Sequence, residues 1–235
     1  MSARALAAVE VYREVAQREL GYPEVKELTS AMHFEGIITC DELCTKLHKL
    51  IEAISGNHVC VAGPLARPER LRGCPVLLAP EGGVPPLMEA GLRPLAVTTD
   101  ADSSLSILNR IVEISDYVML HVHGDNLLRA SALVSSVPRA KLLLTSQVDT
   151  PFCIYPSGAF TDGDRAAAIA MEMGASSIRL VGFDFSSVTC GHKDYCDSDE
   201  KSAKLRTGER VLLKVAGRFG YHLTKDLEGN LLLLK

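Results

Sequence analysis

The chain has 235 residues, of which 47% are hydrophobic and 23% charged, which is enough apolar surface for one large or two small globular domains. It carries 25 Lys and Arg against 29 Asp and Glu, a formal net charge of -4, so it has no basic surplus to neutralise nucleic-acid phosphates. The longest segment without Asp, Glu, Lys or Arg, 53–66, is shorter than the roughly 20 apolar residues of a membrane span. We therefore expect neither nucleic acid nor a membrane as a partner.

The N-terminus and the cysteines favour a protein of the reducing cytoplasm. Residues 1–20 repeat apolar side chains at helical spacing with glutamate and arginine between them, unlike the continuous apolar core of a signal peptide. The cysteines are odd in number and lack the pattern of a secreted disulfide framework. They are Cys40, Cys44, Cys60, Cys74, Cys153, Cys190 and Cys196.

Two groups of cysteines have spacings that could suggest a metal, and we interpret both as structural. Cys40 and Cys44 lie one helical turn apart, as buried thiols often do. Cys190, His192 and Cys196 have no matching second pair of ligands, which favours a mobile surface loop over a zinc site.

The first 55 residues are predicted to be mainly helical. Helices are expected at 3–20 and 41–54, joined by a Gly-Tyr-Pro break and a less regular segment. Residues 1–55 form either a small subdomain or a flank of the sheet that follows.

From residue 58 onward, short apolar runs alternate with glycine-, proline- or acid-rich turns and longer segments of helical period. Most of the runs are apolar on both faces, as buried parallel strands are. Strands are predicted at 58–63, 74–80, 94–99, 116–123, 140–146 and 177–183, helices at 103–115, 127–137, 162–173 and 201–218, and a terminal hairpin that turns at 228–230. The sequence therefore predicts a three-layer α/β fold with a mostly parallel, Rossmann-like sheet in residues 56–235.

In such a sheet, ligands bind where the parallel strands end, and polar residues follow several of the predicted strands. Asp100 and Asp102 follow the third strand, where alternate carboxylates of an extended segment point the same way. Two such carboxylates can hold a Mg²⁺ ion that also binds phosphate oxygens. A helix N-cap with acids in its first turn has the same pattern, so this motif alone does not distinguish a metal site from a helix start.

The segment after the fourth strand offers a second candidate. His121 and His123 share one face of the strand, but no third ligand stands at metal spacing, so we interpret them as hydrogen-bonding groups rather than zinc ligands. Gly124 permits a sharp turn that brings Asp125 to the sheet edge, and Asn126 can cap the next helix.

The third candidate is the start of the helix at 162–173. Thr161 and Asp164 resemble a capping box. Asp162, Gly163 and Arg165 at the same helix start are more than capping requires. Free amides with Arg165 could hold phosphate there, and the acids could hold a metal ion or a polar ring.

Less specific features complete the candidate site. Asp184 follows the strand at 177–183 between Phe183 and Phe185, for which core packing is the favoured role. Glycine turns that could approach a nucleotide closely follow the first two strands. Their candidate residues are Gly63 and Pro64 in the first turn and Glu81 and Gly82 in the second.

Taken in chain order, these motifs resemble those of the archaeal 6-hydroxymethyl-7,8-dihydropterin diphosphokinases. The resemblance runs from about Val59 to about Ser187, and HGDN at 123–126 and FTDGDR at 160–165 are its specific motifs. The family pattern Thr-Asp-Leu-Asp-Gly is represented by TDADS at 99–103, which keeps both acids, and Asp-Gly-Ala is represented by EGG at 81–83.

The resemblance implies transfer of diphosphate from ATP to the hydroxymethyl group of a reduced pterin, with release of AMP, in tetrahydromethanopterin or folate biosynthesis. Mg²⁺ would be the cofactor, ATP and the pterin would be the partners, and a homodimer stays open. Asp100, Asp102 and Asp125 would bind the metal ion, and Asp102, Asp125 and Arg165 would be catalytic. Asp125 would activate the hydroxyl and Arg165 would neutralise phosphate charge. The nucleotide and pterin would contact Gly63, Pro64, Glu81, Gly82, Gly124, Asn126, Thr161, Asp162, Gly163 and Asp164.

Three alternatives remain. The Asp100-Ala-Asp102-Ser103 segment also resembles an element of thiamine pyrophosphokinases, which transfer the same group to another acceptor. Two acids separated by one residue also hold the metal ion of nucleotide-sugar glycosyltransferases. A non-catalytic nucleotide-binding module is the least favoured, because carboxylates clustered without a metal ion repel one another.

Overall fold

The computed structural model describes residues 3–21, 23–186, 188 and 197–235. Cys190, His192 and Cys196 lie outside these residues. The helices are α1 (Ala3–Tyr12), α2 (Arg18–Leu20), α3 (Glu24–His33), α4 (Cys40–Ile54), α5 (Val84–Ala90), α6 (Leu105–Ile114), α7 (Leu127–Ser136), α8 (Asp162–Glu172) and α9 (Ser198–Arg218). The strands are β1 (His58–Ala62), β2 (Val76–Pro80), β3 (Ala96–Thr99), β4 (Tyr117–His121), β5 (Leu142–Ser146), β6 (Tyr155–Pro156), β7 (Ser177–Val181), β8 (His222–Lys225) and β9 (Leu231–Leu234).

The strands form one sheet in the order β6-β5-β4-β3-β2-β1-β7-β9-β8. The strands from β6 to β7 pair in parallel, and the terminal hairpin adds β9 antiparallel to β7. The chain builds the sheet outward from β1 to β6 and then returns to the other side of β1 with β7. The strand order therefore reverses between β1 and β7, which is where α/β proteins of this kind bind ligands.

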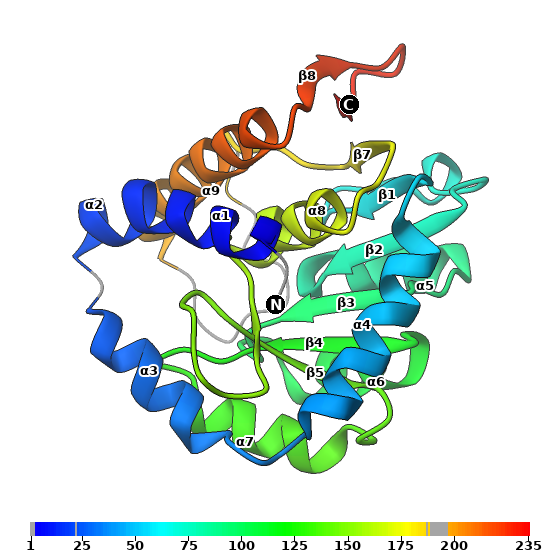
Figure 1. The fold of residues 1–235 in the computed structure, drawn as a ribbon. Coiled ribbons are helices and arrows are strands. Elements are labelled where there is room, and N and C mark those ends of the chain that lie inside the picture. Colours follow the sequence, from blue (N-terminus) through cyan, green and yellow to red (C-terminus); the bar gives the residue numbers. More distant parts are fainter. Residues whose placement is uncertain (1–2, 22, 187, 189–196) are drawn as a thin grey trace.

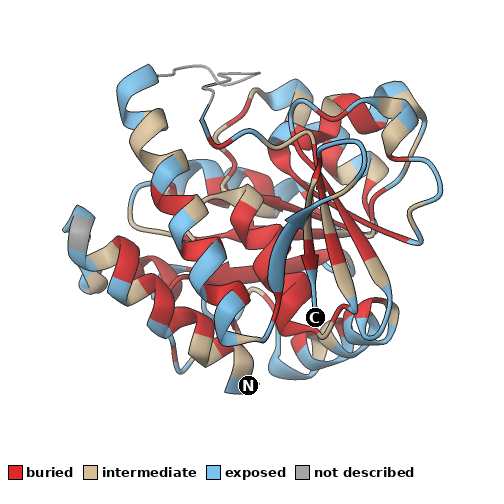
Figure 2. Ribbon diagram, turned by 90° about the horizontal axis from the view of Figure 1, so that it is seen from above, coloured by how far each residue is buried: buried red, intermediate tan, exposed pale blue. Residues whose placement is uncertain are grey.

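Helices cover both faces of the sheet (Figure 1). Helix α8 packs on β1, β2, β3 and β7, and α1 and α9 pack on α8. Right-handed crossovers place α5, α6 and α7 on the opposite face. Figure 2 shows that buried residues concentrate on the strands and on the inner sides of the helices. The predicted α/β class, the mostly parallel sheet and the terminal hairpin are confirmed.

The helical N-terminal segment is also present. The predicted helix at 3–20 is continuous through a π-helical turn at Arg13–Gln17 and ends at Gly21, whose φ of 69° is left-handed. Buried residues of α1 and α4 belong to the same hydrophobic cluster as the strands. The division into units at residue 55 stays a prediction.

Two helices were missed from the sequence, each for a physical reason. Helix α5 begins with Val-Pro-Pro, a pattern typical of a turn, but proline is tolerated in the first turn of a helix because no intrahelical N–H bond is lost there. Helix α3 shows no apolar stripe, because Glu27 and Ser30 stand with Ala31 on its buried side. A helix with a polar buried side gives no hydrophobic period.

The prediction of reduced cysteines, with Cys40 and Cys44 as buried thiols, needs correction. Cys40 pairs with Cys153, and Cys60 pairs with Cys74. Cys44 is a free thiol, and it is exposed rather than buried. The sequence spacing concealed both pairs, because each joins segments that only the tertiary fold brings together.

Within the described part of the chain, no helix is both long and apolar enough to cross a membrane.

Candidate active site

The predicted site residues follow successive strands along one edge of the sheet. From β5 to β7, this edge carries Gln147, the loop at 121–126, Asp100, Glu81, Gly63 and Phe183. The start of α8 lies against the same edge, because the Thr98 hydroxyl on β3 donates a hydrogen bond of 2.9 Å to the backbone oxygen of Asp162. One edge therefore gathers residues that lie far apart in the sequence.

Three carboxylates form the centre of the edge. Glu81, Asp100 and Asp162 each offer one oxygen, and these oxygens all lie within 4.8 Å of one another. We call these three residues the acidic cluster. Glu81 is only 3% exposed, and one oxygen each of Glu81 and Asp162 is buried with no hydrogen-bond partner among the described residues. Three carboxylates this close together, with buried oxygens that lack a partner, have the chemistry of a divalent-cation site.

The local backbone turns the acids toward one another. The Thr99 hydroxyl donates to Glu81 Oε2 and accepts from the N–H of Ala101 at 2.9 Å, which links the ends of β2 and β3. Ala101 has a φ of 62°, in the left-handed region that L-residues rarely adopt. The segment from Asp100 to Asp102 is therefore a turn, and the expectation of an extended segment is wrong.

Mutual repulsion and burial raise the affinity of the cluster for protons. Burial raises the pKa of Glu81 to about 7, with Asp100 and Asp102 adding to the effect. Burial also raises the pKa of Asp162 well above its usual value, with Asp100 and Glu81 adding further. Without a cation the cluster therefore favours bound protons, and a cation would favour the ionised form.

Arg165 is the positive charge nearest to these acids along α8. Its Nε lies 3.9 Å from Asp162 Oδ1, and the residue is 2% exposed. Its Nε and Nη1 find no hydrogen-bond partner among the described residues. A buried guanidinium with spare N–H donors can bind an anionic oxygen, such as one of a phosphate.

The loop after β4 is tied to the loop after β3 by Asn126. Its amide Nδ2 donates to the backbone oxygens of Asp100 at 2.9 Å and His121 at 2.7 Å, and its Oδ1 accepts from the N–H of His123 at 3.0 Å. Asn126 stands at the N-cap position of α7 but makes no capping bond with its side chain, so the predicted capping role is wrong.

The two histidines lie beside the acidic cluster. The His121 ring is buried and its Nδ1 lies 3.1 Å from the Thr145 hydroxyl, and burial places its pKa well below the usual value. His123 Nε2 lies 4.0 Å from Asp100 Oδ2, and burial lowers its pKa too. Both rings are therefore neutral at neutral pH.

The structure places the other predicted metal ligands differently. Asp102 is near enough to raise the pKa of Glu81 and Asp162, but it is not in the acidic cluster. The Asp125 side chain is 67% exposed and lies 3.8 Å from Lys26 Nζ. Neither residue is therefore in the group that could hold one ion with Asp100, whereas Glu81 and Asp162 are.

The start of α8 is capped as predicted. The hydroxyl and N–H of Thr161 each donate to Asp164 Oδ1 at 2.5 Å, and the N–H of Phe160 donates to Oδ2 at 2.8 Å. The capping box is thus confirmed. These bonds occupy Asp164, which is fully buried, and leave Asp162 to join Glu81 and Asp100 in the acidic cluster.

The predicted glycine turns allow close approaches of the backbone. A Cβ atom on Gly63 would lie 2.6 Å from the Gly182 carbonyl oxygen, and one on Gly124 would lie 2.7 Å from Lys26 Cβ. A Cβ atom on Gly163 would lie 2.7 Å from Phe183 Cε1. A Cβ atom at any of these three positions would therefore force a neighbouring atom to shift. Pro64 and Gly82 are exposed neighbours at the end of β1 and β2.

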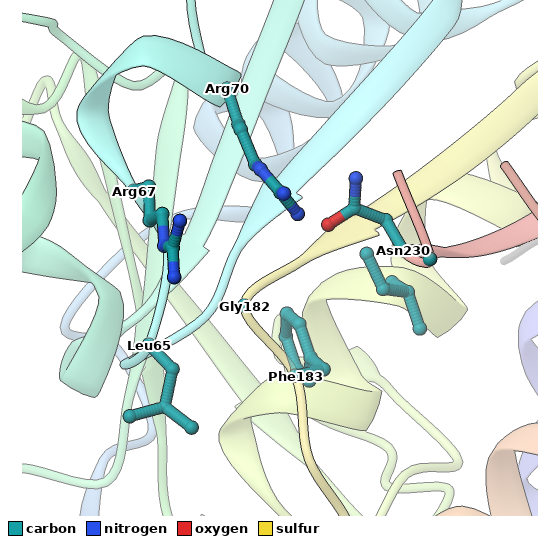
Figure 3. A pocket seen from close by; sticks show the side chains of 8 residues that line it. Leu65, Arg67, Arg70, Gly182, Phe183 and Asn230 are labelled. Carbon is teal, nitrogen blue, oxygen red and sulfur yellow. The ribbon is translucent and has the colours of Figure 1, made fainter. Parts of the chain in front are cut away.

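A pocket of about 210 Å³ lies where the strand order reverses (Figure 3). Arg67 and Arg70 enter it from the segment after β1, Phe183 from the end of β7, and Asn230 from the hairpin. Phe183 also packs against the core, as expected, and Phe185 is buried. Two guanidinium groups and an aromatic ring give this pocket the chemistry of an anionic, aromatic ligand such as a nucleotide.

Sequence reasoning missed two residues near the site. Glu27 on α3 is 5% exposed and Gln147 after β5 is 7% exposed. Burial raises the pKa of Glu27 to about 7, against the opposing effects of Gln147, the Gly124 backbone and Arg165. Gln147 directly follows a strand, which was a usable signal, whereas nothing in the sequence marked Glu27.

Comparisons with known proteins identify similar chains. The chain is 40% identical over 111 residues to the 6-hydroxymethyl-7,8-dihydropterin pyrophosphokinase of Pyrococcus furiosus, a match that covers 47% of this chain and 46% of the relative. Proteins of the same name match from Methanothermobacter thermautotrophicus, with 29% identity over 60% of each chain, and from Methanocaldococcus jannaschii, with 25% identity over 75% of this chain and 78% of the relative. No protein-family model matches the chain.

The first two matches thus span about half of each relative. The resemblance that the motifs indicated is confirmed by these archaeal relatives.

Proposed function

We propose that the chain is an ATP-dependent pyrophosphokinase that transfers diphosphate from ATP to the hydroxymethyl group of 6-hydroxymethyl-7,8-dihydropterin and releases AMP. The observation that carries this proposal is the acidic cluster beside buried Arg165, at the edge of the sheet where ligands bind. The name shared by the three relatives specifies the acceptor.

The acidic cluster fits a Mg²⁺ ion. Glu81 Oε1 and Asp162 Oδ1 are buried without a partner among the described residues, and the cluster supplies the oxygen ligands that this ion prefers. Glu81, Asp100 and Asp162 would hold the ion, in place of the Asp100, Asp102 and Asp125 set expected from the sequence. Bound there, Mg²⁺ would neutralise the negative charge of the phosphate oxygens.

The protein's own side chains would hold and polarise the reactants. Arg165 has two buried N–H donors to offer to phosphate oxygens, where negative charge develops during transfer. Asp102 stands beside the cluster. Asp125, or the neutral ring of His123 at 4.0 Å from Asp100, would accept the proton of the hydroxymethyl group.

The pocket between β1 and β7 is the proposed place of the nucleotide. Arg67 and Arg70 supply positive charge and Phe183 an aromatic ring. Glu81 and the acidic cluster lie at the end of β2, the strand next to β1, so a phosphate chain that leaves the pocket would run toward the cluster. Gly63 and Pro64 directly follow β1, and Gly82 follows β2.

A cytoplasmic location and a homodimer also belong to the proposal. The two disulfides do not exclude the cytoplasm, because some archaeal intracellular proteins are rich in disulfides. Leu105 and Leu128, exposed at the starts of α6 and α7, are apolar residues that a second copy could cover.

The direct test is incubation of the purified protein with ATP, Mg²⁺ and 6-hydroxymethyl-7,8-dihydropterin, with a parallel reaction that contains thiamine. Nucleotide products are separated by chromatography, and the pterin product is identified by mass. We expect AMP and the pterin diphosphate, formed only when the pterin is present.

Other outcomes would contradict the proposal in distinct ways. AMP formed only with thiamine would keep the reaction and replace the acceptor. ADP would mean transfer of a single phosphoryl group. No reaction with either acceptor would point to the nucleotide-sugar alternative, which hydrolysis of a nucleotide sugar would test.

A further inference from the structure

Among the buried oxygens beyond the acidic cluster that lack a hydrogen-bond partner in the described part of the chain, two belong to side chains that interact with each other. They are Oε2 of Glu27 and Oε1 of Gln147. Both side chains are more than nine-tenths buried. Buried polar atoms are nearly always hydrogen-bonded in folded proteins, so two neighbouring atoms of the same kind without a donor indicate a place for something else.

The fold holds Glu27 firmly at the substrate edge of the sheet. Helix α3 packs on the loop after β4, where the Ser30 hydroxyl donates a 2.9 Å hydrogen bond to the backbone oxygen of His123. The absence of a side chain at Gly124 allows this contact, because a Cβ atom there would lie 2.7 Å from Lys26 Cβ. In Figure 1, α3 lies on the side of the sheet where β4 ends. Glu27 is thus a fixed part of the site.

Gln147 and Arg165 are the neighbours of Glu27. Gln147 and Arg165 both act to lower the pKa of the Glu27 carboxyl group, Gln147 through a side-chain hydrogen bond and Arg165 through its charge. The amide of Gln147 interacts with Glu27, yet one oxygen of each side chain still lacks a donor. The charge of Arg165 acts on Glu27, and its Nε lies 3.9 Å from Asp162 Oδ1 of the acidic cluster.

The chemistry of the two oxygens selects the ligand. Both are acceptors, so a phosphate or carboxylate, which offers only oxygens, would be repelled. The edge of a 2-amino-4-oxopyrimidine ring carries two adjacent N–H donors, on N3 and on the 2-amino group, one for Glu27 Oε2 and one for Gln147 Oε1. A reduced pterin presents this edge at the end of the ring opposite its hydroxymethyl group.

We infer that Glu27 and Gln147 form the subsite for the aminopyrimidine edge of the acceptor, an inference that rests on the proposed function. Gln147 follows β5 and Glu81 follows β2, a separation of three strand spacings, or roughly 14 Å. A bicyclic ring bound at Glu27 therefore has room to direct its hydroxymethyl group at the acidic cluster, while the nucleotide pocket lies on the opposite side, at β1 and β7.

The test uses Glu27→Gln, which keeps the shape of the side chain and replaces one acceptor oxygen with a donor. Steady-state kinetics are measured with 6-hydroxymethyl-7,8-dihydropterin and with its 2-oxo analogue, which lacks the 2-amino donor. We expect the variant to raise KM for the pterin by about 10- to 100-fold with KM for ATP unchanged. We also expect the preference of the wild type for the pterin over the 2-oxo analogue to shrink by a similar factor.

Two further variants make the test decisive. Glu24→Gln on the same helix removes only a surface partner of Arg13 and is expected to match the wild type. Gln147→Leu removes the second acceptor, and it carries the test if Glu27→Gln unfolds in a thermal melt. An unchanged KM for the pterin and an unchanged preference against the 2-oxo analogue, in a folded variant, would overturn the inference.

Failure of the proposed function would look different. Wild-type protein that forms no AMP from ATP and the pterin would contradict that function. Binding of 6-hydroxymethylpterin, read by quenching of its fluorescence without ATP, tests the subsite separately. Weaker binding by Glu27→Gln than by Glu24→Gln would support the subsite, and equal binding would overturn it.

Discussion

Asp162 shows how the fold decides the partners of a residue that its local motif marks only as a candidate. It lies between Thr161 and Asp164, which form the cap of α8, and by position it would pass for one more acid of a helix start. The fold instead places it with Glu81 and Asp100, whose charges raise its pKa. Placing its carboxylate beside two others costs folding free energy, and a bound cation would offset that cost.

We predict that Asp162→Asn lowers kcat for AMP formation by about 100- to 1000-fold, because charge neutralisation at the transferring group is lost. Mg²⁺ should raise the melting temperature of the wild type and not of the variant. The free energy of unfolding without Mg²⁺ should not fall, since the substitution removes a repelled charge. Asp116→Asn, on an exposed side chain 4.0 Å from Arg93, is the control. Near-normal activity of Asp162→Asn would remove this residue from the metal site.

Glu172 provides a second prediction, for pH dependence. It lies at the end of α8, 2.8 Å from the Tyr155 hydroxyl, and burial raises its pKa from 4.5 to about 8. Between these pH values the native protein keeps a proton that the unfolded chain has lost, so this group makes stability fall as pH rises from about 4.5 to 8. The glutamine of Glu172→Gln does not titrate. Its side-chain oxygen can still accept the hydrogen bond from the Tyr155 hydroxyl, as the Glu172 carboxyl oxygen does.

The stability advantage of Glu172→Gln over the wild type should therefore grow by about 2 to 4 kcal/mol between pH 5 and pH 8. Urea unfolding at several pH values measures it. Glu27 and Glu81 titrate in both proteins, so their contribution cancels in the difference. Glu35→Gln, at an exposed position, should show no such trend. A difference that is constant with pH would mean that Glu172 is ionised in the native protein.

At the scale of elements, the site depends on the junction of two loops. Asn126 makes one hydrogen bond to Asp100 in the loop after β3 and two to His121 and His123 at the end of β4. Thr98 joins β3 to the start of α8. Each bond involves a backbone atom, so the side chains fix the paths of the loops as well as their own positions. Asp100 and His123 are placed by these contacts.

We predict that Asn126→Ala lowers the free energy of unfolding by about 2 to 3 kcal/mol, because it leaves buried backbone groups without their partner. The activity should fall by about 10- to 100-fold as Asp100 loses its fixed position. Chemical unfolding and AMP formation are measured on the same preparations. Asn57→Ala, which removes a bond to the Ala53 oxygen at an exposed helix end, should change neither greatly. Unchanged activity would show that Asp100 is positioned without Asn126.

At the scale of the whole molecule, the pair Cys40 and Cys153 joins the N-terminal segment to the far edge of the sheet. The two residues are 113 positions apart in the chain. Closing so long a loop removes much conformational freedom from the unfolded chain, so this bond should stabilise the native state strongly. It also restrains the segment that contains Gln147.

We predict that Cys153→Ser lowers the free energy of unfolding by about 3 to 5 kcal/mol in the absence of reductant. Cys44→Ser, on the exposed free thiol, should be within about 0.5 kcal/mol of the wild type. Unfolding in urea with and without a reducing agent measures both. Equal stability of the oxidised wild type and Cys153→Ser would show that this bond does not form or does not stabilise the fold.

The sequence by itself determined all the strands except the two-residue β6, most helices and the order of the ligand-binding loops, because these depend on local hydrophobic period and turn residues. It also identified Asp100, Asp162 and Arg165 as candidates, since each lies beside a strand end or a helix start. Only the tertiary structure brought Glu81 into the acidic cluster and Glu27 to the site. Such groups form between segments that are distant in the chain. Their desolvation and their charge interactions depend on neighbours that a short stretch of sequence does not include.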